Sequence, residues 1–279
     1  TTTFASALAA FYHKIPIGHV EAGLRTHNLY SPYPEEANRQ MVSNIAELHF
    51  TPTMSSLKNL LQENKDPEKI FVTGNTAIDA LKTTVKEEYD SPVLQWAGDS
   101  RIMLLTAHRR ENQGEPLRRI FTAVNKITEK YPDVRVIYPC HMNPAVRGMA
   151  HEIFDGNGKV RLIEPLEVTD FHNLIKKSYL VLTDSGGIQE EGPSLGKPVL
   201  VVRETTERPE GVEAGTLKLV GTSTERIVKE VSRLLDDKEE YERMSTAENP
   251  YGDGNASKRI INAILRYFQN REIGIDIPA

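Results

Sequence analysis

The sequence predicts an α/β protein with parallel β-sheets. Short apolar segments alternate with segments of helical periodicity along most of the chain. Continuously apolar segments, such as RIMLLT at residues 101–106, are typical of strands that are buried on both faces. Strands that are joined by helices in this way form parallel sheets with helices on both sides. Because 279 residues exceed the usual size of one hydrophobic core, we expect two domains.

The first part of the chain contains three predicted strands. Phe4, Leu8 and Phe11 lie on one face of a helix over residues 2–13. The further elements are strands at 15–20, 48–50 and 70–72, and helices that begin near Pro34 and that cover 54–63 and 75–88.

The second part of the chain repeats the alternation after a polar, turn-rich stretch near residue 90. The predicted strands lie at 101–106, 134–138, 160–163, 179–183, 198–202 and near Leu217. The predicted helices cover 115–130, a short segment to Ala150, 168–177, the residues after Gly187, 223–235 and 256–269. We therefore expect residues 1–90 to form the first domain, with residues 256–279 packing back onto it, and residues 91–255 to form the second.

Composition excludes several classes of protein. A net charge of −5 argues against a nucleic-acid-binding protein. No apolar run approaches the ~20 residues of a transmembrane helix, so we expect no membrane association. The single cysteine, Cys140, excludes an internal disulfide and a cysteine metal cluster, and it indicates a reducing, cytoplasmic setting. We interpret Cys140 as a structural residue, because it ends an apolar strand.

A glycine turn at residues 184–187 follows the predicted strand 179–183. Gly186 and Gly187 allow the backbone to approach an anion closely, and the helix after them directs its positive end to the same point. Ser185 adds a hydroxyl donor, and Glu191 could accept hydrogen bonds from sugar hydroxyls. The turn therefore indicates a phosphate site, with an ordinary capped strand-to-helix turn as the alternative.

Polar residues follow the neighbouring strands of the same predicted sheet. His108, Arg109 and Arg110 follow one strand, and His141 follows another. The carboxyl ends of parallel strands share one edge of a sheet, so these side chains should lie beside the glycine turn. Such a cationic edge suits a diphosphate. The other strand-end residues of this sheet are Arg203, Thr205, Thr206 and Arg208.

The first domain contributes carboxylates. His19, Glu21, Arg25 and His27 come at the end of the strand over residues 15–20. They indicate proton chemistry in a cleft, although a solvated loop with local ion pairs would explain them as well. Glu35 begins a helix, where its charge suits the helix dipole and where it can pair with Arg39 four residues on.

No pattern of histidines or paired carboxylates demands a metal. The remaining histidines are interpreted as structural: His13, His49, His151 and His172.

Seven segments together resemble the non-hydrolysing UDP-N-acetylglucosamine 2-epimerases. They are HVEAGLRT, SPYPEEANR, HRREN, HMNP, DSGGIQEE, GKPVL and RETTERPE, and the resemblance runs in order from residue 1 to about residue 270. It implies two Rossmann-like domains of the glycosyltransferase-B type, with a UDP-sugar in the cleft between them. It also implies no cofactor, no metal and a homodimer.

The resemblance implies a reaction as well. The family interconverts UDP-GlcNAc and UDP-ManNAc by eliminating UDP to a 2-acetamidoglucal and adding it back, which supplies ManNAc for bacterial cell-surface polysaccharides. Glu21 and Glu35 would take the acid/base positions around C2 and C3, and His108 would steady the departing UDP.

The binding residues follow from the same resemblance. Phosphate would be held by Ser185, Gly186 and Gly187, ribose by Glu191, and uracil near Leu166 and Phe171. In bacterial members a second UDP-GlcNAc binds as an activator, and the matching positions are Glu35, Arg109 and His141.

The chain departs from the family pattern at its beginning. Family members have further strands and helices before this point, and a catalytic aspartate precedes their threonine run, which matches Thr1. We therefore expect an incomplete first domain and little epimerase activity from these 279 residues. The alternatives are a hydrolysing 2-epimerase that releases ManNAc and UDP, a glycosyltransferase of the same fold, and a non-catalytic UDP-sugar-binding module.

Overall fold

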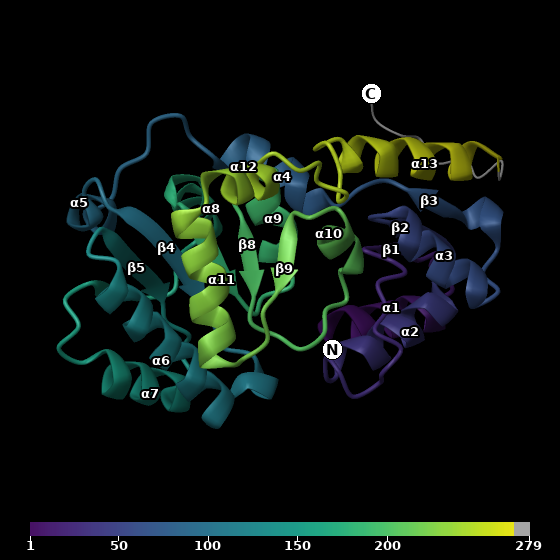
Figure 1. Ribbon diagram of the computed structural model, residues 1–279. Coiled ribbons are helices and arrows are strands. Elements are labelled where there is room, and N and C mark those ends of the chain that lie inside the picture. The colour runs from purple at the N-terminus through teal and green to yellow at the C-terminus, as the bar shows by residue number, and fades with distance from the viewer. Residues whose placement is uncertain (271–279) are drawn as a thin grey trace. The chain divides into compact units, whose positions relative to one another are not determined.

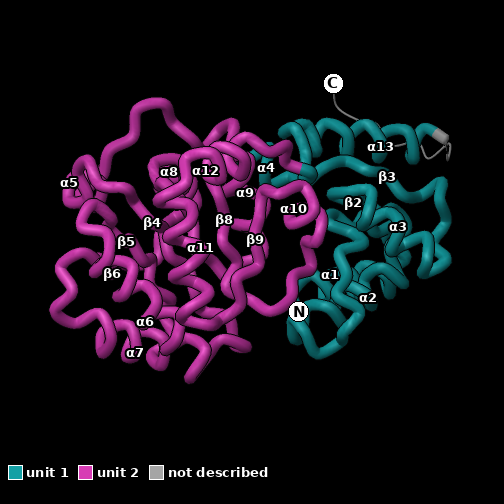
Figure 2. Tube along the Cα trace, viewed as in Figure 1, with its two compact units in different colours: residues 1–80, 250–279 teal, residues 81–249 magenta. Residues whose placement is uncertain are grey.

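The computed structural model describes residues 1–270, which contain two parallel β-sheets (Figure 1). The chain divides into two compact units (Figure 2). Unit 1 comprises Thr1–Ala80 and the C-terminal segment from Pro250, and unit 2 comprises Leu81–Asn249. Residues 271–279, which were expected to pack on the first domain, lie outside the described residues.

The boundary differs from the expected one, because the segment after Ala80 binds to unit 2. Asn173 donates from Nδ2 to the carbonyl oxygen of Thr84 at 2.8 Å, and its Oδ1 accepts the N–H of Lys86 at 2.9 Å. Tyr89 donates its hydroxyl to Asp170 at 2.8 Å. These bonds end the predicted helix 75–88 early, at Thr84.

Unit 1 contains a three-stranded parallel sheet in the order β1-β2-β3. Its strands are β1 (Gly18–Val20), β2 (Leu48–Thr51) and β3 (Ile70–Val72). Its helices are α1 (Thr2–Tyr12), α2 (Glu35–Ile45), α3 (Met54–Gln62), the 3₁₀ helix η1 (Pro67–Lys69), the start of α4 (Thr76–Thr84), and α13 (Ala256–Asn270).

The C-terminal helix α13 completes the core of unit 1. Ile260 and Ala263 are buried against Leu48 and Phe50 of the central strand β2. The last helix therefore packs on the sheet that the first 80 residues build.

Unit 2 contains a six-stranded parallel sheet in the order β6-β5-β4-β7-β8-β9. Its strands are β4 (Arg101–Thr106), β5 (Val134–Pro139), β6 (Val160–Ile163), β7 (Leu180–Thr183), β8 (Val199–Val201) and β9 (Leu217–Leu219). Its helices are α5 (Pro92–Ala97), η2 (Arg110–Asn112), α6 (Glu115–Lys130), α7 (Pro144–Phe154), α8 (Val168–Lys177), α9 (Ile188–Ser194), α10 (Pro209–Glu213), α11 (Thr224–Asp236) and α12 (Lys238–Ser245).

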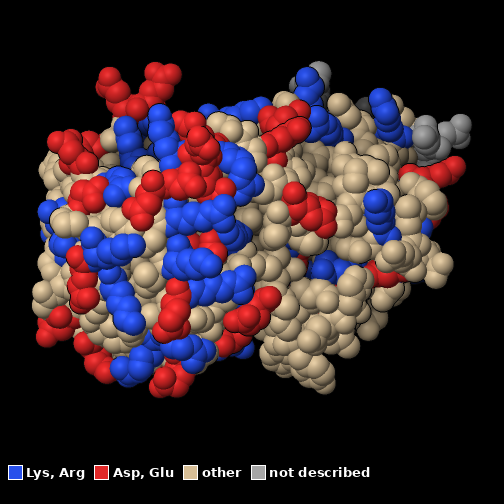
Figure 3. Space-filling model, in the orientation of Figure 1, with Lys and Arg blue, Asp and Glu red and all other residues tan. Residues whose placement is uncertain are grey.

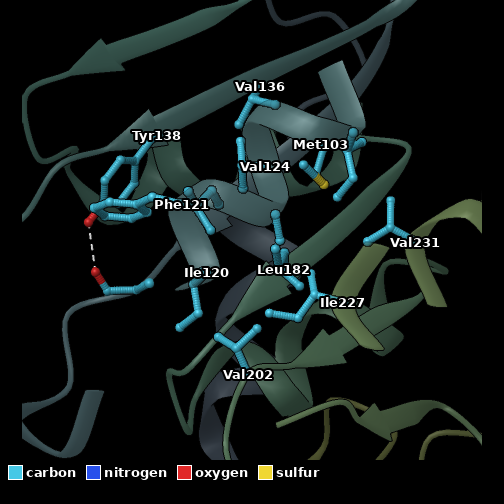
Figure 4. Close-up of a cluster of buried hydrophobic side chains, with 14 of the residues drawn as sticks. Met103, Ile120, Phe121, Val124, Val136, Tyr138, Leu182, Val202, Ile227 and Val231 are labelled. Atoms are coloured by element: carbon cyan, nitrogen blue, oxygen red, sulfur yellow. Dashed lines mark hydrogen bonds between the residues drawn. The ribbon is translucent and has the colours of Figure 1, made fainter. Parts of the chain in front are cut away.

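Strand β4 shows why this sheet is buried on both faces. Met103 and Leu105 point into one hydrophobic cluster, and Ile102 and Leu104 point into the other. Successive side chains of a strand alternate between faces, so a continuously apolar strand needs cover on both. Figure 4 shows the first cluster, in which α6 and α11 pack against the sheet and the Tyr138 hydroxyl donates to the carbonyl oxygen of Ala107 at 2.6 Å.

The strand order of unit 2 creates a switch point between β4 and β7. The chain builds the sheet outward from β4 to β6 on one side and from β7 to β9 on the other. In open parallel sheets, ligands bind beyond the carboxyl ends of the strands at such a point. The loop after β4 and the glycine turn after β7 flank it.

Charged side chains on the face of unit 2 in Figure 3 are mixed in sign. Lysines and arginines alternate with aspartates and glutamates over α11 and α12, where Lys218 pairs with Glu230, and Arg243 with Glu240. Among residues 1–270, no helix is long and apolar enough to cross a membrane.

Candidate active site

The glycine turn joins β7 to α9 and is anchored by its first residues. The N–H of Ser185 donates to Oγ1 of Thr183 at 2.9 Å, and Gln189 donates to the carbonyl oxygen of Ser185 at 3.2 Å. Within residues 1–270, the N–H groups of Gly186 and Gly187 have no hydrogen-bond acceptor. The turn therefore presents two backbone donors at the switch point of the sheet.

A glycine is required at position 186, because a buried ion pair lies close to the backbone there. A Cβ atom there would lie 2.7 Å from Nη1 of Arg208 and 2.8 Å from Oε1 of Glu207. A Cβ at Gly187 would lie 3.5 Å from the Glu191 carboxylate, an ordinary contact. The first glycine thus makes room for a buried ion network, whereas the second faces the Glu191 side chain.

The two arginines Arg203 and Arg208 of the β8–α10 loop are buried in ion pairs. Arg208 pairs with Glu190 at 2.5 Å and with Glu207 at 2.6 Å, and all three are buried. Arg203 pairs with Glu207 at 2.9 Å and with Glu111 at 2.6 Å. Buried charges need partners, so these guanidinium groups are engaged by carboxylates. The expectation that they add to a cationic edge is not met.

Asp184 ties the glycine turn to the loop after β4. Its side chain is fully buried, and Oδ2 accepts the backbone N–H groups of His108 and Arg109, both at 2.8 Å, and the side-chain amide of Asn112 at 3.0 Å. From the sequence, Asp184 is a possible capping residue of the strand-to-helix turn. Its signal is a carboxylate that directly follows a buried strand at the carboxyl edge of the sheet.

His108 lies beside Asp184 and His141. Its Nδ1 is 3.9 Å from Oδ1 of Asp184, and its ring stacks on that of His141 with centroids 4.9 Å apart. Burial lowers the pKa of His108, and the neighbouring His141 and Arg109 act in the same direction, while Asp184 opposes them. The structure therefore brings together three residues that the sequence placed at neighbouring strand ends.

Glu191, Leu166 and Phe171 are the predicted nucleoside-binding residues of unit 2. Leu166 and Phe171 pack against the second hydrophobic cluster. The Glu191 carboxylate lies 3.6 Å from Nε2 of His172, a buried residue that the sequence indicated as structural. Cys140, also interpreted as structural, is buried, and burial raises the pKa of its thiol.

In unit 1, Glu21 lies in the loop after β1, and the backbone of this loop is closely constrained. Its φ of +61° lies in the left-handed region, which non-glycine residues adopt mainly where surrounding structure forces them. Asn75 donates to its Oε1 at 2.8 Å. Two residues later Gly23 has φ +83°, and a Cβ there would lie 2.1 Å from the carbonyl oxygen of Ser56. The loop thus fixes the direction of the Glu21 side chain.

The other charged residues of this loop divide into buried and exposed ones. Arg25 is buried and pairs with Glu63 at 2.6 Å, so it serves the loop as an ion-pair anchor. His27 is exposed. His19 is buried, and burial with the charges of neighbouring residues lowers its pKa to about 3.

Helix α2 carries two adjacent glutamates with different surroundings. Glu35 is exposed. Glu36 is fully buried and accepts the N–H groups of Thr26 and His27 at 3.1 and 3.2 Å, and the amide of Gln40 at 2.9 Å. Glu36 therefore holds the loop between β1 and α2.

A groove of about 580 Å³ lies next to Glu21 in unit 1. Polar residues from α1, β1 and α4 line it, among them Ser6, His19 and Thr76. Within residues 1–270, no group of three or more His, Cys, Asp or Glu side chains is arranged to hold a metal ion.

Comparison with known proteins identifies the family. The family model described as UDP-N-acetylglucosamine 2-epimerase matches residues 1–265. A Bacillus subtilis protein named UDP-N-acetylglucosamine 2-epimerase is 61% identical over 272 residues, which cover 98% of this chain and 72% of the relative.

Solved structures agree in fold. The S. aureus protein MnaA in a co-structure with UDP matches with a TM-score of 0.94 and 55% identity, over 96% of this chain and 73% of that one. The UDP-GlcNAc 2-epimerase from Neisseria meningitidis bound to UDP-GlcNAc matches with a TM-score of 0.90 and 49% identity, over 95% of this chain and 74% of that one. The observed parallel α/β units confirm the predicted fold class, and the chain belongs to the UDP-N-acetylglucosamine 2-epimerase family.

Proposed function

We propose that this protein interconverts UDP-GlcNAc and UDP-ManNAc by eliminating and re-adding UDP, and that it supplies ManNAc units for cell-surface polysaccharides. Relatives named UDP-N-acetylglucosamine 2-epimerase support the reaction, and structures of relatives with UDP and with UDP-GlcNAc support the ligands. The observation that carries the proposal is the pair of backbone donors at Gly186 and Gly187, which lie at the switch point of the unit 2 sheet.

The glycine turn is the proposed diphosphate site. The N–H groups of Gly186 and Gly187 and the hydroxyl of Ser185 donate to phosphate oxygens. His108 and Arg109 extend from the adjacent loop, which Asp184 holds at the same edge. Departure of UDP leaves negative charge on the diphosphate, and fixed donors stabilise that charge without reorganisation.

The nucleoside is proposed to lie against α8 and α9. Phe171 and the backbone near Leu166 hold uracil, and the Glu191 carboxylate accepts hydrogen bonds from the ribose hydroxyls. A carboxylate that accepts hydrogen bonds from both ribose hydroxyls discriminates against ligands that lack one of them. With such a ligand, one carboxylate oxygen is left without a hydrogen-bond donor.

Glu21 and Glu35 are the proposed proton-transfer groups. A base removes the C2 proton, the C1–O bond breaks, UDP departs with the bonding pair, and a C1=C2 double bond forms. Protonation of C2 on the opposite face and return of UDP to C1 complete the inversion. The left-handed backbone at Glu21 and its bond from Asn75 are the geometry expected of a fixed base.

A second UDP-GlcNAc is proposed as an activator that contacts Glu35, Arg109 and His141. His141 stacks on His108. A ligand on His141 would therefore act on a residue of the proposed diphosphate site.

The test follows the sugar in D₂O by NMR. The protein is used at a concentration near that of UDP-GlcNAc. The proposal expects UDP-ManNAc with deuterium at C2, and a loss of about 10²–10⁴-fold in rate for Glu21→Gln. Glu68→Gln, which changes an exposed carboxylate of the same unit, should leave the rate unchanged.

Three results would count against the proposal. Free ManNAc with UDP would indicate the hydrolysing reaction. UDP-ManNAc without deuterium would exclude removal of the C2 proton. Binding of UDP in calorimetry without any product would leave a UDP-sugar-binding protein.

A further inference from the structure

His172 lies between Thr84 and the carboxylate of Glu191, the residue that is proposed to bind the ribose. Its ring is 2% exposed, and Nδ1 lies 2.7 Å from Oγ1 of Thr84. The other ring nitrogen, Nε2, lies 3.6 Å from Oε2 of Glu191. One histidine therefore bridges the end of α4 and the first turn of α9.

The carboxylate beside Nε2 suits one neutral tautomer of His172 better than the other. When the Thr84 hydroxyl donates to Nδ1, the ring proton sits on Nε2 and points toward the Glu191 carboxylate. The opposite tautomer would direct the Nε2 lone pair at a carboxylate oxygen, which is repulsive. The arrangement thus favours His172 as a donor to Glu191.

The backbone at Thr84 is held by hydrogen bonds with a neighbouring residue. Asn173, the next residue on α8, donates to the carbonyl oxygen of Thr84 at 2.8 Å and accepts the N–H of Lys86 at 2.9 Å. The ring of His172 therefore contacts a threonine whose backbone is held by hydrogen bonds. Side chains that are supported in this way hold a binding group in place with little loss of entropy on binding.

The two oxygens of Glu191 face different groups. Oε2 faces His172, while Oε1 lies 3.5 Å from where a Cβ on Gly187 would be. The Glu191 side chain keeps 16% of its surface exposed. Oε1 therefore remains open beside the glycine turn, on the side where the nucleotide is proposed to bind.

We propose that His172 is a positioning residue, which holds the Glu191 carboxylate for the ribose hydroxyls and so sets the preference for a ribonucleotide. This inference rests on the proposed role of Glu191 in UDP binding. It gives His172, which the sequence indicated as structural, a part in nucleotide specificity.

The test measures Kd for UDP and for 2′-deoxy-UDP by calorimetry. Loss of a hydrogen bond to a charged group weakens binding by about tenfold or more, so the wild-type protein should prefer UDP by about that factor. His172→Phe keeps the ring and removes both nitrogens. It should weaken UDP binding about five- to tenfold and leave 2′-deoxy-UDP within about twofold.

Two variants serve as controls. His172→Gln retains a donor near the position of Nε2 and should restore part of the preference. His151→Phe changes an exposed histidine on α7 and should alter neither Kd. Equal weakening of both ligands by His172→Phe, or no change in either, overturns the proposal.

The double variant separates positioning from general damage. In a Glu191→Gln background, His172→Phe should weaken UDP binding by less than about twofold, because the two residues act as one unit. A full additional loss overturns the inference. If Glu191→Gln alone keeps the preference for UDP, the proposed ribose site fails. If Glu191→Gln loses the preference and His172→Phe keeps it, only the present inference fails.

Discussion

Removal of the Asp184 carboxylate should destabilise unit 2 by an amount that the structure allows us to estimate. Its Oδ2 accepts three N–H groups, from His108, Arg109 and Asn112, at 2.8–3.0 Å. A donor that is left unsatisfied in a buried site costs about 1–3 kcal/mol. Water can reach part of the loop after β4, so we expect Asp184→Ala to lower the free energy of unfolding by about 3–5 kcal/mol.

Asp184→Asn is the matched variant. Its amide oxygen can still accept the three N–H groups, so the loss should be about 1 kcal/mol, which corresponds to the charge-assisted part of the bonds. The pair of variants therefore separates the acceptor from the charge.

Urea unfolding followed by tryptophan fluorescence measures the effect. The only tryptophan, Trp96, lies in unit 2, so its signal reports on the unit that contains Asp184. With a slope of about 2–3 kcal/mol/M, the midpoint for Asp184→Ala should fall by about 1–2 M. A midpoint within about 0.3 M of the wild-type value, or an equal loss in both variants, would refute the reasoning.

Three further predictions concern the loops and histidines. Gly23→Ala should lower the free energy of unfolding of unit 1 by more than about 3 kcal/mol in urea unfolding, because its Cβ would lie 2.1 Å from the carbonyl oxygen of Ser56. The control Gly148→Ala, at an exposed position of α7, should be neutral or stabilising. His19 has a folded-state pKa of about 3, below its usual 6.5, so the unfolded chain binds the proton first. Stability should fall as pH drops from 6.5 toward 3, and His19→Gln should show a shallower decline; equal declines would contradict this. UDP binding should raise the lowered pKa of His108, because the negative diphosphate favours the protonated ring. Calorimetry near pH 6.5 in buffers of different ionisation enthalpy should therefore show that protons are taken up on UDP binding, and His108→Asn should abolish this uptake.

The parallel sheets could be predicted because the signal is local. Strands such as β4 and β7 are apolar over consecutive positions, Ile102 to Leu105 and Leu180 to Leu182, and they are separated by helices with one apolar face. Burial on both faces leaves few other arrangements for such strands. The order of the strands, and with it the switch point, depends on long-range pairing that no single segment encodes.

Two of the helices that the sequence did not predict, α5 and α12, lack that local signal. Helix α12 has the sequence KEEYERMS, in which charged residues dominate, and α5 lies in a stretch that reads as turns. Each has a side-chain cap, from Asp237 and from Ser91. Helix α12 is also supported by ion pairs of Glu240 with Arg243 and Arg233. Side-chain caps and ion pairs stabilise these helices. The spacing of their apolar residues did not predict a helix.

The candidate site was predictable in its residue types but not in their partners. The order of motifs indicated Glu21, His108 and the glycine turn. It did not indicate that Glu36 is buried under the loop, since adjacent glutamates at a helix start look alike in sequence. Asp184 and His172 act through neighbours that lie more than 70 residues away in the chain. Such roles depend on the tertiary fold.

The charge balance around the glycine turn explains why its backbone carries the proposed phosphate site. Arg208, which lies beside Gly186, pairs with Glu190 and Glu207, and Arg203 pairs with Glu207 and Glu111, so these two buried guanidinium groups are already engaged by carboxylates. A diphosphate beside this network cannot rely on those cations and needs donors that are free of carboxylates. The N–H groups of Gly186 and Gly187 are such donors, and the lack of a side chain at Gly186 makes room for the ion network. The buried network therefore leaves room only for a glycine at position 186, and the backbone N–H groups of the turn remain for the proposed diphosphate site.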